Sequence, residues 1–353
     1  MAELRPLIDK LNEEHLLSHD ELISMFTCRN PEDSEYMRAL AQETAVRSYG
    51  HDIFLRGLIE FTNYCRNDCL YCGIRRSNEK AERYRLTKDE ILSCCEAGYS
   101  FGLRTFVLQG GEDMTYREED FCELISEIRN RFPDCAITLS VGERPREVYE
   151  AYYAAGADRY LLRHETSSPE HYALLHPAGL SVENRKRCLR DLKDIGFQIG
   201  AGFMVGSPYQ TYDHLAEDFE YLKELEPHMI GIGPFIHHND TPFANFPDGS
   251  YELTLYCLSM LRLMFPSVLL PATTALGTIH PLGREEGIRH GANVIMPSLS
   301  PKDVRKKYLL YDGKICTGEE AAECHACLER RISGIGYRAV SSRGDHIGWS
   351  RRL

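Results

Sequence analysis

The sequence predicts an α/β fold, a full (β/α)8 TIM barrel with an N-terminal helical extension and a C-terminal extension. The first observation is an alternation of short, largely apolar runs with segments at helical spacing, which is typical of a parallel sheet. The second is the count, because eight strand-like runs lie between residues 57 and 296. An open barrel with fewer strands and a separate C-terminal domain is the alternative.

This pattern divides the chain into three parts. Residues 1–50 read as the helical extension, 51–300 as the barrel and 301–353 as the C-terminal extension. The motifs Ser18-His19-Asp20-Glu21 and Thr87-Lys88-Asp89-Glu90 are capping boxes, and each predicts a helix start. The predicted strands are 57–62, 104–108, 136–140, 158–162, 197–203, 228–233, 268–271 and 292–296. The predicted helices between them are 87–101, 117–132, 145–155, 181–195, 211–225, 251–264 and 283–290.

Composition limits the partners and the compartment. Of the 353 residues, 43% are hydrophobic, which is enough to build a large core. The 41 Lys and Arg residues face 53 Asp and Glu residues, and this net charge of −12 argues against nucleic acid as a bulk electrostatic partner. Thirteen cysteines, with no signal core and no apolar run near ~18 residues, predict a cytoplasmic, reducing setting and no membrane partner.

The strongest motif is Cys65-Arg66-Asn67-Asp68-Cys69-Leu70-Tyr71-Cys72, a CxxxCxxC spacing directly after the first predicted strand. Three thiolates on one short loop can bind three irons of a [4Fe-4S] cubane, which leaves the fourth iron open. An open iron is what S-adenosylmethionine (SAM) needs in order to chelate the cluster. The spacing resembles that of the radical-SAM enzymes.

Other interpretations of this loop are weaker. A structural zinc site normally takes four ligands in two separated pairs, and no fourth thiol or imidazole lies nearby. A disulfide framework is typical of short secreted chains, which this is not. Three core cysteines within eight residues, next to Arg66, Asn67 and Asp68, would be unusual.

Unusual polar residues follow the predicted strands. Gln109-Gly110-Gly111-Glu112 ends the second strand and places two glycines where a backbone can approach a ligand closely. Thr138 lies on the third strand, and Met204 and Met229 lie near the ends of later strands. Methionine is more often core filler than a cofactor contact. Thr273 and Thr274 place two hydroxyls at the end of the seventh strand.

The fourth strand ends in Arg163-His164-Glu165, three ionisable residues that are costly to place in a barrel mouth without ligands. An ion pair between Arg163 and Glu165 that closes the barrel top is the alternative. A guanidinium at Arg185 can clamp a carboxylate in two places. From this residue alone, however, a surface arginine is the favoured interpretation.

A second cysteine set, Cys316 with Cys324-His325-Ala326-Cys327, lies near the end of the chain. Its residues are compatible with a second iron–sulfur cluster, with a zinc site that includes His325, or with a redox dithiol. The following residues carry many arginines, among them Arg330, Arg338, Arg343 and Arg351. Such a run is usually a solvated surface, and here it is a candidate for docking an acidic partner.

The chain resembles the HydE family of radical-SAM maturases of [FeFe]-hydrogenase, within the biotin synthase-like group. The resemblance begins near residue 50 and covers the rest of the chain. The segments that carry it are 56–61 with the cysteine loop, 71–76, 83–85, 142–147, 157–166, 231–236, 271–275 and 291–297.

The resemblance implies a cofactor site. The Gly111-Glu112 turn would bind the methionine amino group of SAM through its backbone, with Gln109 leading into it. Glu165 and Arg185 would contact SAM, and Tyr71 would pack near the adenine. Thr138, Met204 and Met229 would line the pocket. Cys316, Cys324 and Cys327 match an optional accessory-cluster motif, which favours a second iron–sulfur cluster of the [2Fe-2S] or [4Fe-4S] type over zinc.

It also implies a substrate and partners. Arg163, Thr273, Thr274 and Tyr311 would line a deeper anion and substrate site. The implied substrate is a small organometallic iron–cysteine species with CO and cyanide ligands. It would be supplied by another hydrogenase maturase, and an electron donor would reduce the cluster. The family commonly has Ser where this chain has Gly110, so a serine contact to the substrate cannot be carried over.

Three alternatives remain open. The first alternative is a methylornithine synthase, but that enzyme lacks the C-terminal cysteine set that this chain has. Biotin synthase carries further cysteines on the barrel strands, and here only Cys135 lies near a strand. A non-catalytic scaffold that carries a cluster would not need to keep the SAM-binding residues.

Overall fold

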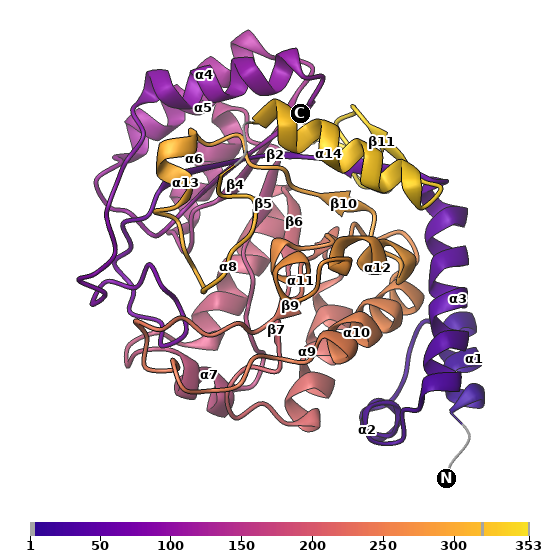
Figure 1. Cartoon of the computed structure of the whole chain (residues 1–353). Coiled ribbons are helices and arrows are strands. Elements are labelled where there is room, and N and C mark those ends of the chain that lie inside the picture. The colour runs from indigo at the N-terminus through magenta and orange to yellow at the C-terminus, as the bar shows by residue number, and fades with distance from the viewer. Residues whose placement is uncertain (1–3, 319–320, 352–353) are drawn as a thin grey trace.

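A computed structural model describes residues 4–318 and 321–351, apart from the side chains of residues 321–324. Its centre is a parallel sheet of six strands in the order β2-β3-β4-β5-β6-β8 (Figure 1). A three-stranded sheet, β10-β1-β11, and a two-stranded sheet, β7-β9, are also parallel. The strands are β1 Asp52–Leu55, β2 Gly57–Thr62, β3 Thr105–Gly110, β4 Ala136–Ser140, β5 Arg159–Leu161, β6 Gln198–Ala201, β7 Met204–Val205, β8 Met229–Ile230, β9 Gly233–Pro234, β10 Val294–Ile295 and β11 Arg338–Val340.

Helices connect the strands and cover the sheet from outside (Figure 1). The first seven are α1 Arg5–Glu14, α2 His19–Thr27, α3 Pro31–Tyr49, α4 Lys88–Ser100, α5 Glu118–Arg131, α6 Arg146–Ala155 and α7 Pro169–Leu175. The others are α8 Val182–Ile195, α9 Tyr212–Leu225, α10 Tyr251–Met264, α11 Thr274–Ile279, α12 Gly283–Arg289, α13 Lys302–Arg305 and α14 Ala321–Gly334. Among the described residues, no helix is long and apolar enough to cross a bilayer.

Parallel pairing continues beyond the six-stranded sheet through single bridges. Met229 on β8 bridges to Leu269, and Pro271 bridges to Val294 on β10. Strand β10 pairs with β1, and Leu58 on β2 bridges to Ser298. The predicted strand 268–271 is therefore present as bridged residues only. The parallel α/β sheet that the alternation predicts is confirmed.

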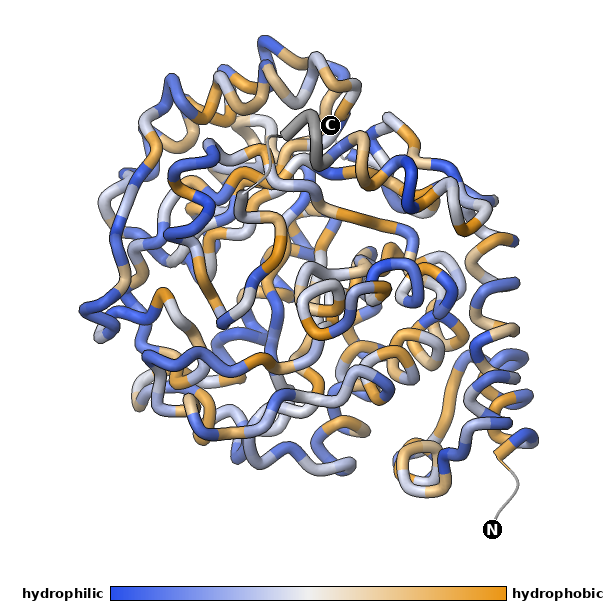
Figure 2. Tube along the Cα trace, viewed as in Figure 1, coloured by the Kyte–Doolittle hydropathy of each residue, from blue (hydrophilic) through white to orange (hydrophobic). Residues whose placement is uncertain are grey.

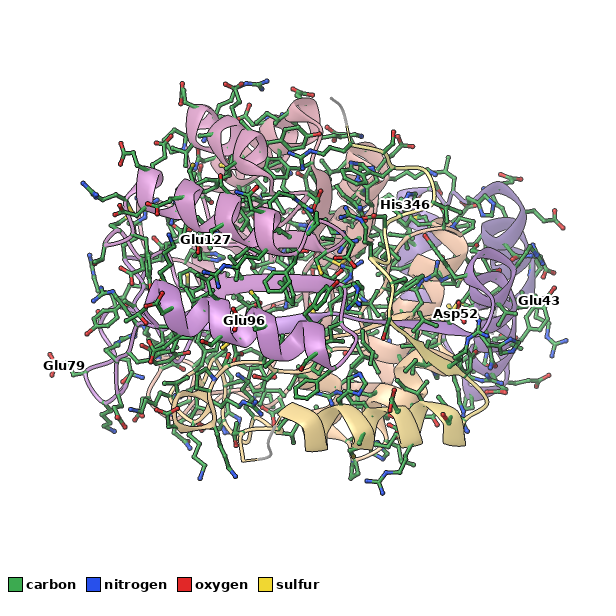
Figure 3. The ribbon with its side chains drawn as sticks, turned by 90° about the horizontal axis from the view of Figure 1, so that it is seen from above. Glu43, Asp52, Glu79, Glu96, Glu127 and His346 are labelled. Carbon is green, nitrogen blue, oxygen red and sulfur yellow. The ribbon has the colours of Figure 1, made fainter. Side chains whose placement is uncertain are left out.

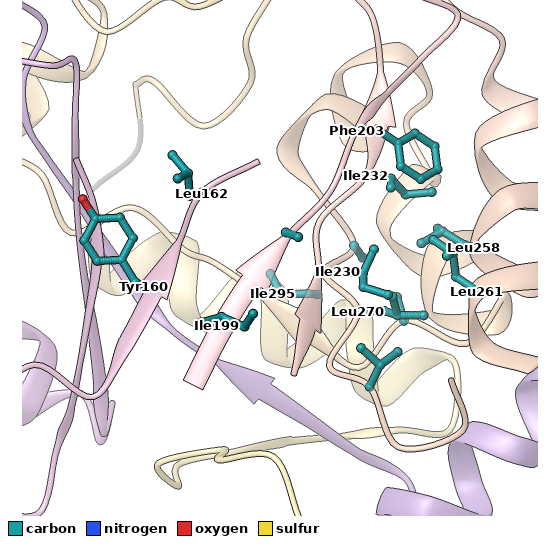
Figure 4. Close-up of a cluster of buried hydrophobic side chains, with 14 of the residues drawn as sticks. Tyr160, Leu162, Ile199, Phe203, Ile230, Ile232, Leu258, Leu261, Leu270 and Ile295 are labelled. Atoms are coloured by element: carbon teal, nitrogen blue, oxygen red, sulfur yellow. The ribbon is translucent and has the colours of Figure 1, made fainter. Parts of the chain in front are cut away.

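The two faces of the strands bury different side chains. Tyr160, Leu162, Ile199, Ile230 and other residues of one face pack with Leu258 and Leu261 of α10 (Figure 4). The alternate residues Leu161, Met229, Leu269 and Val294 form a separate buried cluster. Residues two apart on a strand share a face, so Arg163 lies on the face of Leu161, while His164 follows Tyr160 and Leu162.

The N-terminal helices pack on the outer helices of the α/β part. Helix α3 lies against α10, and α2 lies against α9. Figure 2 shows hydrophobic and hydrophilic positions alternating along these helices, as expected for elements buried on one side only. Both predicted capping boxes are present, at Ser18 before α2 and at Thr87 before α4. The domain boundaries near residues 50 and 300 stay predictions.

The C-terminal segment 341–351 lies at the amino ends of the strands (Figure 3). Its Asp345 pairs with Arg159 at 2.6 Å and accepts a hydrogen bond from Gln198, while the Arg343 carbonyl accepts one from Thr105. Arg343 and Arg351 both pair with the buried Asp158. The prediction of a solvated basic tail is wrong for these two arginines, because their partners are carboxylates of the chain itself.

Candidate active site

The cysteine loop leaves the carboxyl end of β2 and is held by its own backbone. Cys72 N–H donates to the Cys69 carbonyl at 3.3 Å, and Arg76 N–H donates to the Asn67 carbonyl at 2.9 Å. Arg75 pairs with Asp68 at 2.8 Å inside the loop. These contacts close CxxxCxxC into a compact turn that brings its three thiols into one region.

Burial raises the pKa of all three thiols. The pKa of Cys69 rises to about 12, first through burial and then through the neighbouring Cys65 thiol. Burial also raises the pKa of Cys65 and of Cys72. A thiol with a raised pKa is a poor nucleophile, whereas a bound cation deprotonates a coordinating thiol. The raised pKa values therefore argue against uncoordinated, nucleophilic thiolates at these positions.

The turn after β3 packs directly on this loop, and it needs glycine there. A Cβ at Gly111 would lie 2.2 Å from the Tyr64 carbonyl oxygen and 2.7 Å from the Cys65 Cβ. At Gly110, a Cβ would lie 2.7 Å from Thr62 Cγ2, so a serine would have to displace Thr62.

Glu112 ties the same turn to the cysteine loop. Its N–H donates to Cys65 Sγ at 3.4 Å, and its carboxylate pairs with Arg66 at 2.9 Å. The other carboxylate oxygen accepts from the N–H of Glu143, which follows β4. Residues from the ends of three strands thus converge beside Cys65.

Arg185 is buried and continues this network, so the interpretation as a surface arginine is wrong. Its Nε pairs with Glu143 at 2.5 Å, and its Nη1 donates to the Arg163 carbonyl at 2.8 Å. Burial alone would lower the pKa of the guanidinium, but Tyr172 and Glu143 raise it well above its ordinary value. Arg185 stays a cation close to Cys69 and Tyr71.

Arg163 and Glu165 lie at the end of β5, next to this cation. Their side chains are 2.9 Å apart, as the ion-pair alternative expects. Yet Arg163 Nε and Nη2 and Glu165 Oε2 make no aligned hydrogen bond within the described residues, and Thr138 Oγ1 makes none either. Buried polar groups normally have partners. A polar ligand that carries both an amino and a carboxylate group, as SAM does, fits this set.

Tyr71 and Met204 lie together. They belong to one apolar cluster with Leu175, Phe235 and Phe243, at the edge of the cysteine loop. Burial lowers the pKa of His176 to about 3, and its Nδ1 faces the Tyr172 carbonyl, so its Nε2 accepts from Tyr71 O–H at 3.2 Å. This neutral, apolar wall suits an aromatic base.

Met229 is not part of that wall. It belongs to the cluster of Leu161, Leu269 and Val294, and its Sδ accepts from the buried Arg56 at 2.9 Å. Gln109 is half-buried at the end of β3, where its amide donates to Tyr308 O–H at 3.4 Å. Roles for Met229 and Gln109 in binding SAM stay predictions.

Of the four predicted substrate residues, Thr274 and Tyr311 both lie near Arg284, and Tyr311 also lies near Arg163. Thr273 caps α11, and Thr274 Oγ1 accepts from Arg284 at 3.4 Å. Tyr311 lies within electrostatic range of Arg163, Arg284 and Glu60, and burial raises the pKa of its phenol. A cavity of about 20 Å³ is lined by Leu58, Glu60, Thr274, Arg284, Lys314 and Cys316 among others.

The second cysteine set is described in part. Cys316 has a positive φ of 61° and lies 3.7 Å from Arg284 Nη1, at the cavity. Cys327 is exposed on α14, and Arg331 lies near both thiols. The side chain of Cys324 is outside the described residues. None of the cysteines whose side chains are described forms a disulfide.

A mononuclear site is not formed by the described side chains. No three His, Cys, Asp or Glu residues among them gather to hold a single metal ion. The cysteines of a cubane bind different iron atoms, so their side chains need not converge on one point.

Comparison with known proteins gives consistent results. The model of the Radical SAM superfamily matches residues 59–222. The [FeFe] hydrogenase maturase subunit HydE of Thermotoga maritima is 44% identical over 332 residues, which cover 94% of each chain. The chain belongs to the HydE family. It is a radical-SAM enzyme of hydrogenase maturation, and the family implies a [4Fe-4S] cluster and SAM.

More distant relatives share the fold of this HydE-family chain. The 3-methylornithine synthase of Methanosarcina acetivorans is 28% identical and covers 93% of this chain and 92% of its own length. The crystal structure of a methylornithine synthase, PylB, superposes with a TM-score of 0.83 at 26% identity, covering 95% of this chain and 97% of that one. The α/β architecture is therefore that of the radical-SAM fold.

Some residues of the site were not anticipated. Glu143, His176, Arg284 and Lys314 all contact predicted site residues or line the cavity. Glu143 and Arg284 lie in segments with no local motif that marks them as polar and buried. Segment 142–147, which contains Glu143, carries part of the family resemblance, but no role was assigned to Glu143.

Proposed function

We propose that Cys65, Cys69 and Cys72 ligate the [4Fe-4S] cluster and that Glu165 and Arg185 bind SAM on it. The observation that carries this proposal is the proximity of Cys69 to Arg185 and Glu165, beside buried polar atoms of Arg163, Glu165 and Thr138 that make no aligned hydrogen bond. Tyr71 and Met204 would receive the adenine, and Gly111 and Glu112 would approach the methionine group. When bound and reduced, this pair of cofactors supplies a 5′-deoxyadenosyl radical.

The eight strand segments would close into a full (β/α)8 barrel around the reactants. The bridges Met229–Leu269, Pro271–Val294 and Leu58–Ser298, with the β1–β10 pairing, support closure between β8 and β2. The buried inner cluster of Leu161, Met229, Leu269 and Val294 also supports it, because the inward residues of a closed barrel pack in layers.

The substrate would be a small organometallic iron–cysteine species with CO and cyanide ligands, used in assembly of the diiron subcluster of [FeFe]-hydrogenase. Arg163, Thr273, Thr274 and Tyr311 would line its site. Arg163 and Arg284 near Tyr311 support an anionic substrate, because cations act strongly on charge where water is excluded. Another maturase would supply the substrate, and an electron donor would act in the reducing cytoplasm.

The test is reconstitution of hydrogenase maturation from purified components. We expect active hydrogenase only when this protein is present with SAM, and none with the Cys69→Ala variant. Full maturation without the protein would contradict the proposal. Normal activity of the Cys69→Ala variant would contradict the assignment of the cluster ligands.

Synthesis of methylornithine is the second candidate, because the fold and length match a methylornithine synthase closely. A reaction of the biotin synthase type is a weaker alternative. Mass spectrometry of the products formed from the methylornithine synthase substrate would decide. Formation of 3-methylornithine at catalytic turnover, with no effect on hydrogenase maturation, would favour this candidate over the first.

A further inference from the structure

His164 and Asp218 form a buried pair immediately behind the candidate SAM site. His164 Nε2 lies 3.3 Å from Asp218 Oδ1, and both side chains are 0% exposed. His164 follows β5, whereas Asp218 lies on α9, in the outer helical layer. Burying a carboxylate is costly unless it holds hydrogen-bond donors, so this pair needs an explanation.

The chain alternates at this point between two environments. Arg163 and Glu165 are half-buried and face each other at the candidate site. The intervening His164 and the following Thr166 are buried on the other side. Holding the His164 side chain on the α9 side therefore also sets the direction in which Arg163 and Glu165 point toward the candidate site.

The hydrogen bonds define how His164 is held. Its Nδ1 accepts from Gly202 N–H at 3.3 Å, so in the neutral ring the proton sits on Nε2, whose contact with Asp218 Oδ1 is close but is not an aligned hydrogen bond. The same Asp218 oxygen accepts from Ser167 N–H at 2.5 Å. One carboxylate oxygen thus anchors residues on both sides of Glu165.

Glu165 itself has a backbone conformation that needs such support. Its φ is +66°, in the left-handed region that side chains other than glycine rarely adopt. Its N–H donates to the Gly202 carbonyl at 3.1 Å, and its carbonyl accepts from Met204 N–H at 3.2 Å. A strained conformation persists only where the surroundings determine it fully.

We propose that Asp218, acting through His164 and Ser167, positions Glu165 for SAM. The inference rests on the proposed function, which assigns a SAM contact to Glu165. Asp218 touches neither the cysteine loop nor the apolar wall of Tyr71 in any described contact. It is a positioning residue, and its effect on SAM depends on the carboxylate of Glu165.

The test measures the Kd of SAM by calorimetry on the cluster-loaded protein, with iron content measured in parallel. The Asp218→Leu variant removes the carboxylate that accepts from Ser167 N–H and contacts His164, which is expected to raise the Kd about 10- to 100-fold at unchanged iron content. Asp218→Asn keeps one acceptor oxygen and is expected to restore most of the affinity. Asp33→Leu, which removes a buried carboxylate on α3, is the matched control and should leave the Kd within about threefold.

A Kd for Asp218→Leu equal to that of Asp33→Leu overturns the proposal, as does equal weakening by Asp218→Asn and Asp218→Leu. If Asp218→Leu does not fold, His164→Asn replaces it, because it keeps the acceptor near Gly202 and loses the contact to Asp218. The same weakening is expected for that variant, and unchanged affinity overturns the proposal.

Combination with Glu165→Gln separates this inference from the proposed function. Glu165→Gln alone should weaken SAM binding, and Asp218→Leu should then add less than about threefold, because coupled residues are non-additive. An unchanged Kd for Glu165→Gln contradicts the proposed SAM contact. If Glu165→Gln weakens SAM binding and the effects of Glu165→Gln and Asp218→Leu on the Kd are fully additive, the SAM contact of Glu165 stands. The positioning role of Asp218 is then overturned.

Discussion

Gly111 places a purely steric constraint on the site. Its missing side chain lets the turn after β3 touch Tyr64 and Cys65, so the turn and the cysteine loop form one unit. Every other residue type has a Cβ, so no other residue lets the backbone come this close to the cysteine loop. The identity of this residue therefore matters for packing before any ligand is considered.

We expect Gly111→Ala to lower both stability and iron content. The new methyl group would overlap the Tyr64 carbonyl at 2.2 Å, and such overpacking costs about 1–3 kcal/mol. Urea denaturation and iron analysis measure the two effects. Gly334→Ala is the control, because a Cβ there meets nothing within 4 Å. Equal stability and iron content in the two variants would contradict the steric argument.

The three loop cysteines make a chemical prediction. Cys69→Ala should leave protein that forms no 5′-deoxyadenosine from SAM and dithionite, because two thiolates do not hold a cubane with one open iron. Cys122→Ala, on the outer helix α5, should cleave SAM as the wild type does. Chromatography of the nucleoside products makes the measurement. Unchanged cleavage by Cys69→Ala would reject the cluster ligands named here.

Local spacing was informative for some residues and not for others. The cysteine motif and the Gly111-Glu112 turn are each readable from a few neighbouring residues. The setting of Arg185 was not, because its partners Glu143 and Arg163 lie in other segments. Only the three-dimensional structure shows that the guanidinium of Arg185, near the start of its helix, is buried. Asp218 was missed for the same reason.

Among the elements, the C-terminal segment 341–351 has a clear energetic role. It brings Asp345 to the buried Arg159 and the Gly344 carbonyl to the buried Arg56. Burial lowers the pKa of both guanidinium groups, and Asp345 partly offsets this. The segment therefore stabilises two cations at the amino ends of the strands.

Asp345→Asn should destabilise the fold in a pH-dependent way. Burial would raise the pKa of Asp345, but Arg159 and Arg343 hold it below its ordinary value. A carboxyl group whose pKa is lowered in the folded state stabilises the fold at pH values above its unfolded pKa of about 3.9. This stabilisation is lost as the pH falls through the folded-state pKa. We expect a loss of about 1–3 kcal/mol at pH 7, since Asp345 is partly exposed.

Urea denaturation at pH 7, 5 and 3.5 checks this expectation. The difference between wild type and Asp345→Asn should be largest at pH 7 and should shrink below about pH 4. Asp120→Asn, which breaks an exposed pair with Arg117, should change little at any pH. If the stability difference between wild type and Asp345→Asn is the same at all three pH values, the charge of Asp345 does not contribute to stability.

Long elements were predicted more closely than short ones. Strands β2 to β4 and the helices with capping boxes match their predicted ranges closely, because their periodicity extends over several residues. Strands β1 and β11 were missed, since each is short and is defined by its partner in the sheet. Helices α7, α11, α13 and α14 were missed as well, and three of them are seven residues or fewer.

For the molecule as a whole, the two cysteine sets should be separable. Replacing Cys316, Cys324 and Cys327 by alanine should lower the iron content while SAM cleavage continues, because none of the three lies on the cysteine loop. Iron and zinc analysis with a SAM cleavage assay makes the measurement. Loss of zinc rather than iron would show that the second cysteine set binds zinc. Loss of SAM cleavage would show that the second set is required for activity.

The contacts of residues 307–312 with the cysteine loop have a consequence for biosynthesis. Asn63 binds the carbonyl of Lys307, which lies 244 residues later in the chain, and Gly73 N–H binds the Leu310 carbonyl. During translation the cysteines leave the ribosome long before these partners exist. The loop completes its packing only when nearly the whole polypeptide has been made, so a nascent chain presents these thiols in an unfinished setting.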